Sequence, residues 1–232
     1  MAKTSFARML ASAFAVYALC AGLRLLEWPR WAGAPAWLDG RPILPTADAF
    51  AWLAGAEGAG RLAGWPMSVV IASLAGIVQQ APEWVAFWLP AALGPLPGVF
   101  IAVICVRRGY PLAALTAGIF AGASLGYLGR TRLGYADTDL FALSLAVAMA
   151  LSWAAGARAL VVAAGRGFEA GAGWRLGAAV TVAWLYMLLY PSAYPVAVAV
   201  VAGGAAYAWL AIRGGGWPAT GGLVLWSLGA LI

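Results

Sequence analysis

The most polar short segment of this 232-residue chain is GRTRLGYADTD, residues 129–139, which lies between two apolar runs. Asp137 and Asp139 stand two positions apart in it. Carboxylates presented in this way can bind Mg²⁺ or Mn²⁺, which prefer oxygen ligands and keep coordination positions for phosphate oxygens. Arg130 or Arg132 could orient a carboxylate or a phosphate through paired hydrogen bonds. The segment is therefore typical of a divalent-metal site that also binds an anionic group.

A further acidic candidate is Asp48, in the stretch PTADAFAWLAGAEG. Each of these aspartates could instead stand at the start of the following helix, where its charge is favoured by about 0.3 to 1 kcal/mol, and for Asp48 taken alone capping is the commoner role. The arginines would then be anchors at the membrane interface. Asp39 and Glu57 lie near Asp48 in surroundings that indicate solvent, so they are not expected in a site.

The stretch Tyr190-Pro191-Ser192-Ala193-Tyr194 follows an apolar run. Its two tyrosines can belong to an aromatic belt at the membrane interface, with a proline turn between them. Alternatively, the stretch can be a polar rim that faces a lipid-borne substrate. The sequence leaves both interpretations open.

The residue inventory excludes several kinds of chemistry. The chain contains no histidine and no asparagine, so a Ser-His-Asp triad and a histidine-ligated zinc or haem are impossible. Lys3 is the only lysine, and no phosphate-binding glycine loop follows a strand-like segment. Cys20 and Cys105 are isolated in apolar runs, which argues against a disulfide framework or a metal knuckle.

The composition requires that these residues be carried by membrane helices. Hydrophobic residues make up 64% of the chain, charged residues only 9%, and the mean hydropathy is +0.88. We expect an all-α polytopic transmembrane bundle, a single domain over residues 1–232, with glycine and alanine on helix faces that approach closely. The predicted spans are 9–26, 84–106, 111–128, 140–157, 174–190 and 195–212, and a seventh begins near residue 217.

Two external loops follow from this pattern. Residues 27–83 are rich in proline and acidic residues and read as a long first external loop with short interfacial helices at 48–57 and 67–80. Residues 129–139 form the second external loop. Arginines indicate that the N-terminus is cytoplasmic and the acidic face periplasmic, in an inner membrane, so the net charge of +6 is a topology signal and predicts no nucleic acid partner.

The last predicted span is short. From residue 217 to residue 232 a helix would be about 24 Å long, whereas the hydrocarbon core is about 30 Å thick. We therefore expect that these residues are part of something longer, ending before a soluble C-terminal domain.

Three segments, in this order, resemble the bacterial oligosaccharyltransferase PglB family and the related eukaryotic and archaeal catalytic subunits. They are Asp48-Ala49-Phe50-Ala51 in the long external loop, R-T-R-L-G-Y-A-D-T-D at residues 130–139, and L-L-Y-P-S-A-Y at residues 188–194. The second segment is specific because the spacing from its first arginine to its aspartates is that of the family. Gly129, Ala136 and Ala193 depart from the family pattern.

The resemblance implies a C-type glycosyltransferase that moves an oligosaccharide from a polyprenyl-pyrophosphate carrier to an asparagine of an acceptor polypeptide. Asp48, Asp137 and Asp139 would bind Mg²⁺ or Mn²⁺, and Arg130 would steady the aspartates. Tyr190 and Tyr194 would contact the lipid-linked sugar.

The resemblance also implies parts that these residues lack. A further metal-binding glutamate and a soluble domain that reads the acceptor sequon come later in that family. We thus expect the N-terminal membrane portion of an oligosaccharyltransferase, inactive alone unless further segments or a second polypeptide complete it.

Two other classes of function stay open from the sequence. One is a non-catalytic membrane scaffold or degenerate remnant of the same family. The other is a transporter or channel, which the placement of the acidic residues in loops disfavours because ion paths place acids within the spans.

Overall fold

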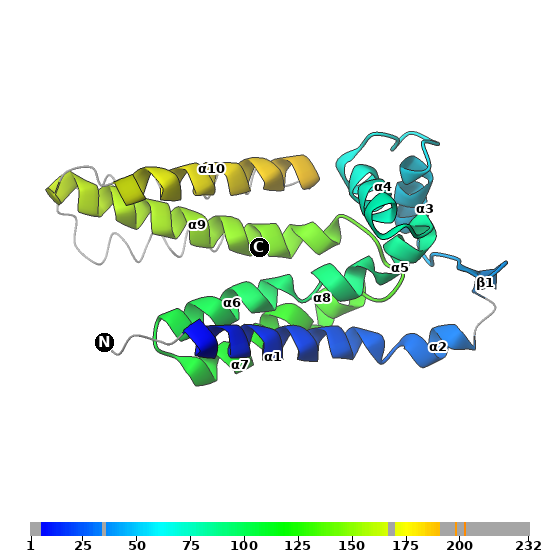
Figure 1. The fold of residues 1–232 in the computed structure, drawn as a ribbon, viewed down its shortest axis with the longest axis horizontal. Helices are drawn as coiled ribbons and strands as arrows, with labels where there is room; N and C mark the ends of the chain where they lie inside the picture. Colours follow the sequence, from blue (N-terminus) through cyan, green and yellow to red (C-terminus); the bar gives the residue numbers. More distant parts are fainter. Residues whose placement is uncertain (1–5, 34–35, 167–169, 191–197, 199–201, 203–232) are drawn as a thin grey trace. The chain divides into compact units, whose positions relative to one another are not determined.

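We describe the chain from a computed structural model, which places residues 6–33, 36–166, 170–190, 198 and 202. These residues are almost entirely helical, with one short hairpin, so the predicted all-α helix bundle is confirmed (Figure 1). The chain forms two compact units, residues 1–140 and residues 141–232, and each is described by itself.

The first unit contains most of the elements. They are α1 (Phe6–Leu25), α2 (Trp28–Ala32), β1 (Trp37–Leu38), β2 (Arg41–Pro42), α3 (Ala47–Ala56), α4 (Pro66–Val78), α5 (Pro82–Leu93), α6 (Leu96–Arg107), α7 (Pro111–Ala123) and α8 (Leu125–Arg130). In the second unit, α9 (Asp139–Arg166) and α10 (Ala170–Leu189) lie side by side (Figure 1).

Proline marks the beginning of α4, α5, α6 and α7, where it occupies one of the first two helical positions. Its fixed φ suits a helix start, and its missing N–H would be unpaired there anyway. The two interfacial helices predicted at 48–57 and 67–80 correspond to α3 and α4 within a few residues. Local signals were therefore sufficient to place these elements.

A hairpin connects α2 to α3. Strands β1 and β2 pair antiparallel, with Trp37 opposite Pro42. The turn residues Asp39 and Gly40 have φ values of 49° and 76°. Two successive residues at positive φ are the requirement of a tight hairpin turn, which an Asp-Gly pair meets well.

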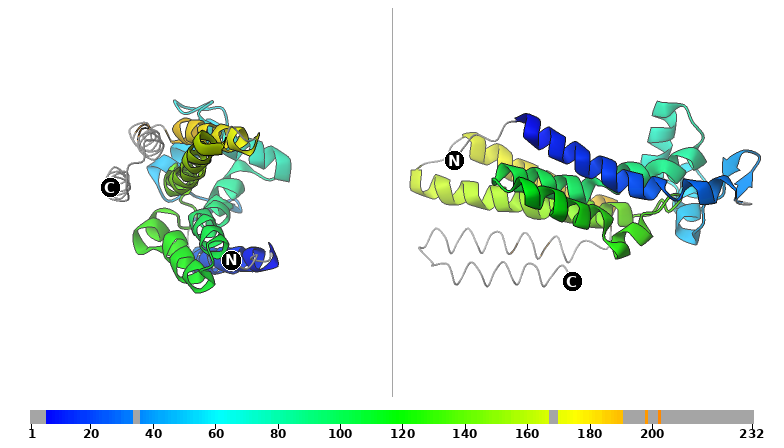
Figure 2. Two further views of the ribbon diagram at one scale, coloured as in Figure 1. Left: turned by 90° about the vertical axis from the view of Figure 1, so that its left-hand side faces the viewer. Right: turned by 90° about the horizontal axis from the view of Figure 1, so that it is seen from below.

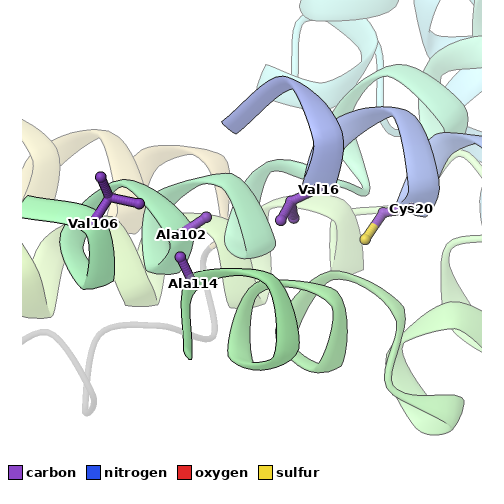
Figure 3. Packing of buried hydrophobic residues seen from close by; sticks show 5 residues of the cluster. All are labelled: Val16, Cys20, Ala102, Val106 and Ala114. Carbon is purple, nitrogen blue, oxygen red and sulfur yellow. The ribbon is translucent and has the colours of Figure 1, made fainter. Parts of the chain in front are cut away.

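The membrane part of the first unit is a three-helix core of α1, α6 and α7, which run side by side in both views of Figure 2. Val16 and Cys20 of α1 meet Ala102 and Val106 of α6 and Ala114 of α7, all buried (Figure 3). Such small side chains allow helix backbones to approach closely, as membrane helices require when water supplies no driving force between them.

Glycines make the closest approach in this core. A Cβ on Gly118 of α7 would lie 3.0 Å from the Gly98 carbonyl oxygen of α6 and 3.0 Å from Val16 Cγ2. The prediction that glycine faces permit close packing is thus confirmed, and the structure adds which helices meet.

The span predicted at 84–106 is long and apolar enough to cross a bilayer but consists of two helices, and the span predicted at 111–128 ends early. The span predicted at 84–106 is divided into α5 and α6 around Gly94 and Pro95, because prolines at positions 90, 95 and 97 withhold backbone N–H donors. The span predicted at 111–128 ends at Ala123, where Ser124 adopts an extended ψ of 143° before α8 begins.

Three stretches of the described chain are long and apolar enough to cross a bilayer: 6–32, 82–107 and 139–156. Side chains on the outer faces of α1 and α7, such as Phe14 (73% exposed), Leu112 (82%) and Phe120 (77%), are available to lipid. The chain is a membrane protein. Of the span predicted at 195–212 the structure describes only residues 198 and 202, and the span predicted beyond residue 217 lies outside the described residues.

Aromatic side chains gather where α2, the hairpin and α5 meet. Phe87 of α5 is fully buried, and the centroids of five indole rings lie between 4.9 and 6.4 Å from its ring: those of Trp28, Trp31, Trp37, Trp84 and Trp88. Most of these contacts are edge-to-face, the arrangement that aromatic quadrupoles favour. This aromatic cluster holds α2 and the hairpin to the start of α5.

Within the second unit, α9 and α10 pack through Ala146 and Met149 against Ala183 and Tyr186. They correspond to the spans predicted at 140–157 and 174–190, and α9 extends further than predicted, to Arg166.

Candidate functional site

The polar segment of residues 131–139 joins α8 to α9, and α3 packs against it. The indole Nε1 of Trp52, in α3, donates a hydrogen bond of 3.1 Å to Oδ1 of Asp137. Both residues are shielded, since Trp52 is buried and Asp137 half-buried. A side chain of α3 therefore fixes an aspartate that lies 85 positions later.

Asp137 is held by its own neighbour as well. Its Oδ1 accepts from the backbone N–H of Thr138 at 2.6 Å and from the Thr138 hydroxyl at 3.2 Å. Among the described residues, every hydrogen bond that the side chain of Asp137 accepts ends on Oδ1. Oδ2 is therefore the oxygen left to bind a cation or a substrate N–H.

Asp48 lies in the first turn of α3, and it does not cap that helix. The cap is Thr46, whose hydroxyl accepts from the backbone N–H of Ala49 at 3.1 Å. The capping role that sequence alone would give Asp48 is thus filled by another residue. Asp48 is exposed and stands one helical turn before Trp52, on the same face of α3. Because Trp52 contacts Asp137, that face is the one directed at the polar segment.

Asp139 is the first residue of α9 and forms an ion pair with Arg130. The Nη1 atom of Arg130 lies 2.9 Å from Asp139 Oδ2. The arginine side chain is 74% exposed and the aspartate side chain 19%. The position of Asp139 in the first helical turn also favours its negative charge. The ion pair and the position at the helix start therefore both stabilise the negative charge of Asp139.

Arg132 forms an ion pair with Glu27, the residue between α1 and α2 that precedes α2. Its Nε donates to Glu27 Oε1 at 2.6 Å, and its guanidinium lies 5.5 Å from the ring centroid of Tyr135. Of the two arginines proposed from the sequence to orient an anionic group, Arg130 is the one beside an aspartate.

Gly134 gives the segment its turn. Its φ is 80°, a conformation that residues with a side chain rarely adopt. Its N–H donates to the Phe87 carbonyl at 3.0 Å, and a Cβ there would lie 3.1 Å from Pro45 and 3.2 Å from Trp31. Glycine is needed at this position for both conformation and space, so the aromatic cluster and the polar segment are joined here.

Sequence reasoning missed Arg24, which is fully buried near the end of α1. Its Nε donates to the Thr131 carbonyl at 2.8 Å, and its Nη1 donates to the carbonyls of Cys20 at 3.0 Å and Gly122 at 3.1 Å. Its Nη2 donates to the Thr131 hydroxyl. The signal was an arginine within an apolar run, which is costly in a membrane and usually has a purpose.

No group of three or more side chains of the metal-ligating types lies together within the part of the chain that the structure describes. Asp39 is in the exposed hairpin turn, and Glu57 is exposed at the end of α3. The binding of Mg²⁺ or Mn²⁺ by Asp48, Asp137 and Asp139 stays a prediction. Mg²⁺ is usually bound by one or two carboxylates and completes its shell with water and substrate phosphates.

Tyr190 belongs to the second unit and follows α10. Its ring stacks on that of Tyr186 with centroids 6.0 Å apart and an interplanar angle of 13°. Tyr194 lies outside the described residues. The role expected for both tyrosines at a lipid-linked sugar stays a prediction.

Comparison with known families gives a decisive match. The model described as "Oligosaccharyl transferase STT3, N-terminal" matches residues 59–208, well over half of the chain. The chain belongs to the STT3 family. A comparison with curated proteins finds no match.

The STT3 match covers residues 129–139, which include the polar segment, and the stretch that contains Tyr190 and Tyr194. It begins after α3, and Trp52 of α3 is connected to the matched region by its hydrogen bond to Asp137. The family identifies the chain as a membrane portion of an oligosaccharyltransferase, the coarse class that the motifs had suggested.

Proposed function

We propose that this STT3 chain binds the donor side of an oligosaccharyl transfer reaction, at a site made by Asp48 and Asp137. The observation that carries the proposal is the hydrogen bond from Trp52 to Asp137, which turns the Asp48 face of α3 toward the polar segment. The donor is a polyprenyl-pyrophosphate-linked oligosaccharide, and the acceptor is an asparagine of a polypeptide, as the resemblance implies.

The residues of this chain have distinct tasks in the proposal. Asp48 and Asp137 would hold Mg²⁺ or Mn²⁺, and Asp137 presents Oδ2 because Oδ1 is occupied by Trp52 and Thr138. When bound, such an ion neutralises negative charge that develops on a pyrophosphate leaving group. Arg130 neutralises Asp139 beside the site, which lessens repulsion between the two neighbouring carboxylates.

Carboxylate oxygens near the ion can also accept hydrogen bonds from the amide of the acceptor asparagine. An amide nitrogen is a weak nucleophile, and acceptors aimed at its N–H groups favour the charge distribution of the transition state. Tyr190 and Tyr194 would contact the lipid-linked sugar. The proposed location is the inner membrane, with the N-terminus cytoplasmic and the site on the periplasmic face.

We infer that these 232 residues bind metal and donor without transferring glycan. The resemblance assigns one further metal ligand and the sequon-reading motif to segments other than these, which a longer chain or a second polypeptide would supply. Glycosylation of a sequon peptide by the purified 232-residue chain would contradict this inference.

The test is Mn²⁺ binding to the purified 232-residue chain in detergent, followed by electron paramagnetic resonance. Free Mn²⁺ gives a sharp spectrum that weakens when the ion is bound. We expect Asp137→Asn, which keeps the shape and removes the charge, to weaken binding at least about tenfold. Trp52→Phe, which removes only the indole donor, should weaken binding by about the tenfold that supporting residues contribute.

The matched control is Asp39→Asn, a change at an exposed aspartate of the same external loop. Asp39 has a left-handed backbone conformation, which asparagine also tolerates. It should leave Mn²⁺ binding unchanged. Equal binding by Asp137→Asn and the unsubstituted chain would reject the proposed ligand. Absence of any Mn²⁺ binding would favour the alternative function, a non-catalytic scaffold of the STT3 family, to which the departures at Gly129 and Ala136 also point.

A further inference from the structure

Arg24 is the one charged side chain among the described residues of the first unit that is completely buried. Its partners come from three places in the chain: its own helix, the end of α7 and the end of α8. All the oxygen atoms that it binds are main-chain carbonyls or a hydroxyl. A guanidinium has five N–H donors in a rigid plane, so it can bind several oxygens at fixed angles.

These partners are the ends of helices. Gly122 lies in the last turn of α7, and Thr131 is the residue at which α8 ends. Carbonyls in the last turn of a helix have no partner within the helix and carry partial negative charge. In an apolar environment without water, each such carbonyl would be costly to leave unbound. Arg24 thus satisfies both helix ends with a positive charge that suits their dipoles.

The surroundings are shaped to admit this arginine. A Cβ on Gly94, at the break between α5 and α6, would lie 2.6 Å from Arg24 Cζ. The guanidinium also lies 5.6 Å from the ring centroid of Tyr127, a distance typical of cation–π contact. Gly94 at the helix break and the ring of Tyr127 on α8 therefore both lie against the Arg24 guanidinium.

Thr131 is where the polar segment starts. The next residue, Arg132, is bound by Glu27, which stands one turn after Arg24 in the same part of the chain. The end of α1 thus binds two successive residues of the segment, one through a buried cation and one through an ion pair. Six residues after Thr131 comes Asp137, the proposed metal ligand.

We propose that Arg24 is a positioning residue for the polar segment: it joins the ends of α7 and α8 to α1 and thereby sets where residues 131–139 begin. Arg24 acts on Asp137 only through the backbone of this segment. The consequence for metal binding rests on the proposed function, whereas the effect on the segment itself does not.

The experiment is hydrogen–deuterium exchange, measured by mass spectrometry on the full 232-residue chain in detergent. The first variant is Arg24→Met, which keeps length and removes every donor, and the matched control is Arg30→Met, an exposed arginine of α2. We expect peptides covering 131–139 to exchange at least about tenfold faster in Arg24→Met, because charge-assisted hydrogen bonds are lost. Peptides of α3 and α4, and the Arg30→Met chain, should exchange as before.

Conservative variants separate positioning from general support. Arg24→Lys retains the charge and some donors, so it should restore part of the protection in 131–139. Thr131→Val removes one acceptor, and its effect should not add to that of Arg24→Lys, because contacting partners are coupled. These two variants give the same test if Arg24→Met does not fold.

Three outcomes would overturn the proposal: unchanged exchange in 131–139, faster exchange spread evenly over α1, α6 and α7, or full additivity of the two conservative variants. Mn²⁺ binding, measured on the same samples, is read separately. Faster exchange in 131–139 in a chain that never binds Mn²⁺ would support the role of Arg24 and reject the proposed metal site.

Discussion

At the scale of single residues, Asp137 is positioned by contacts that originate far from it in the sequence. Trp52 binds its side chain from α3, and Phe87 of α5 binds the backbone of Gly134 three residues before it. Neither partner has an unusual residue type for its element. Their importance follows only from what they contact in the folded chain.

Gly134 offers a prediction at this scale. Gly134→Ala places a side chain at φ 80° and within 3.1 to 3.3 Å of Pro45 and Trp31. We expect a loss of about 1 to 3 kcal/mol in stability, seen as a lower melting temperature, because both strain and overpacking are introduced.

The control for this prediction is Gly129→Ala, in α8, where a Cβ meets nothing within 4 Å. Alanine is favoured over glycine in a helix, so that variant should melt at the same temperature or slightly higher. Equal melting temperatures for the two variants would show that the turn at Gly134 is not constrained as described.

At the scale of elements, the sequence predicted helix ends that depend on local signals, but it did not predict a helix break that depends on contacts between distant residues. The prolines that begin α4 and α5 lie within two residues of the helix starts predicted at 67 and 84, and the structure reproduces both closely. The break at Gly94 was missed because an apolar run of 23 residues reads as one span, and the break accommodates Arg24, whose partners lie about 100 positions away.

The same contrast applies to the site. The R-T-x-x-G-Y-x-D-T-D string led to the prediction of Asp137, Asp139 and Arg130 as site residues, because residues that can do chemistry are close together in it. The contacts from Trp52 and Arg24 could not be predicted, because hydropathy and spacing carry no information on which helices meet.

Helix packing gives a prediction at the element scale. Gly118→Val would drive a branched side chain against the Gly98 carbonyl and Val16, so α1, α6 and α7 would have to separate. We expect a loss of about 1 to 3 kcal/mol of stability, measured by thermal unfolding in detergent.

A matched change for comparison is Gly22→Val in α1, where a Cβ has open space within 4 Å. Like Gly118→Val, it introduces a β-branched residue into a helix, but it does not create a clash with a neighbouring helix. Destabilisation as large for Gly22→Val as for Gly118→Val would mean that the close approach of these helices is not important.

At the scale of the whole molecule, the charges predict which ends of the helices face the cytoplasm. Arg107 and Arg108 lie at the end of α6, and the acidic residues of the first unit lie in the two segments predicted to be external, 27–83 and 129–139. In a chain with Cys20 and Cys105 replaced by alanine, a single cysteine at Asp39 should react with a membrane-impermeant maleimide added to intact spheroplasts. A single cysteine at Arg108 should react only after the membrane is opened. The reverse pattern would reject the proposed orientation.

The five tryptophans around Phe87 have a spectroscopic consequence. Indole rings as close as Trp28 and Trp88, at 5.2 Å, or Trp37 and Trp84, at 5.3 Å, exchange excitation energy rapidly and couple their electronic transitions. Their ultraviolet circular dichroism should therefore show a couplet of paired positive and negative bands. That signal would arise where the hairpin, α2 and α5 contact one another beside Gly134. It would therefore report, without any label, whether this part of the chain is packed against the polar segment.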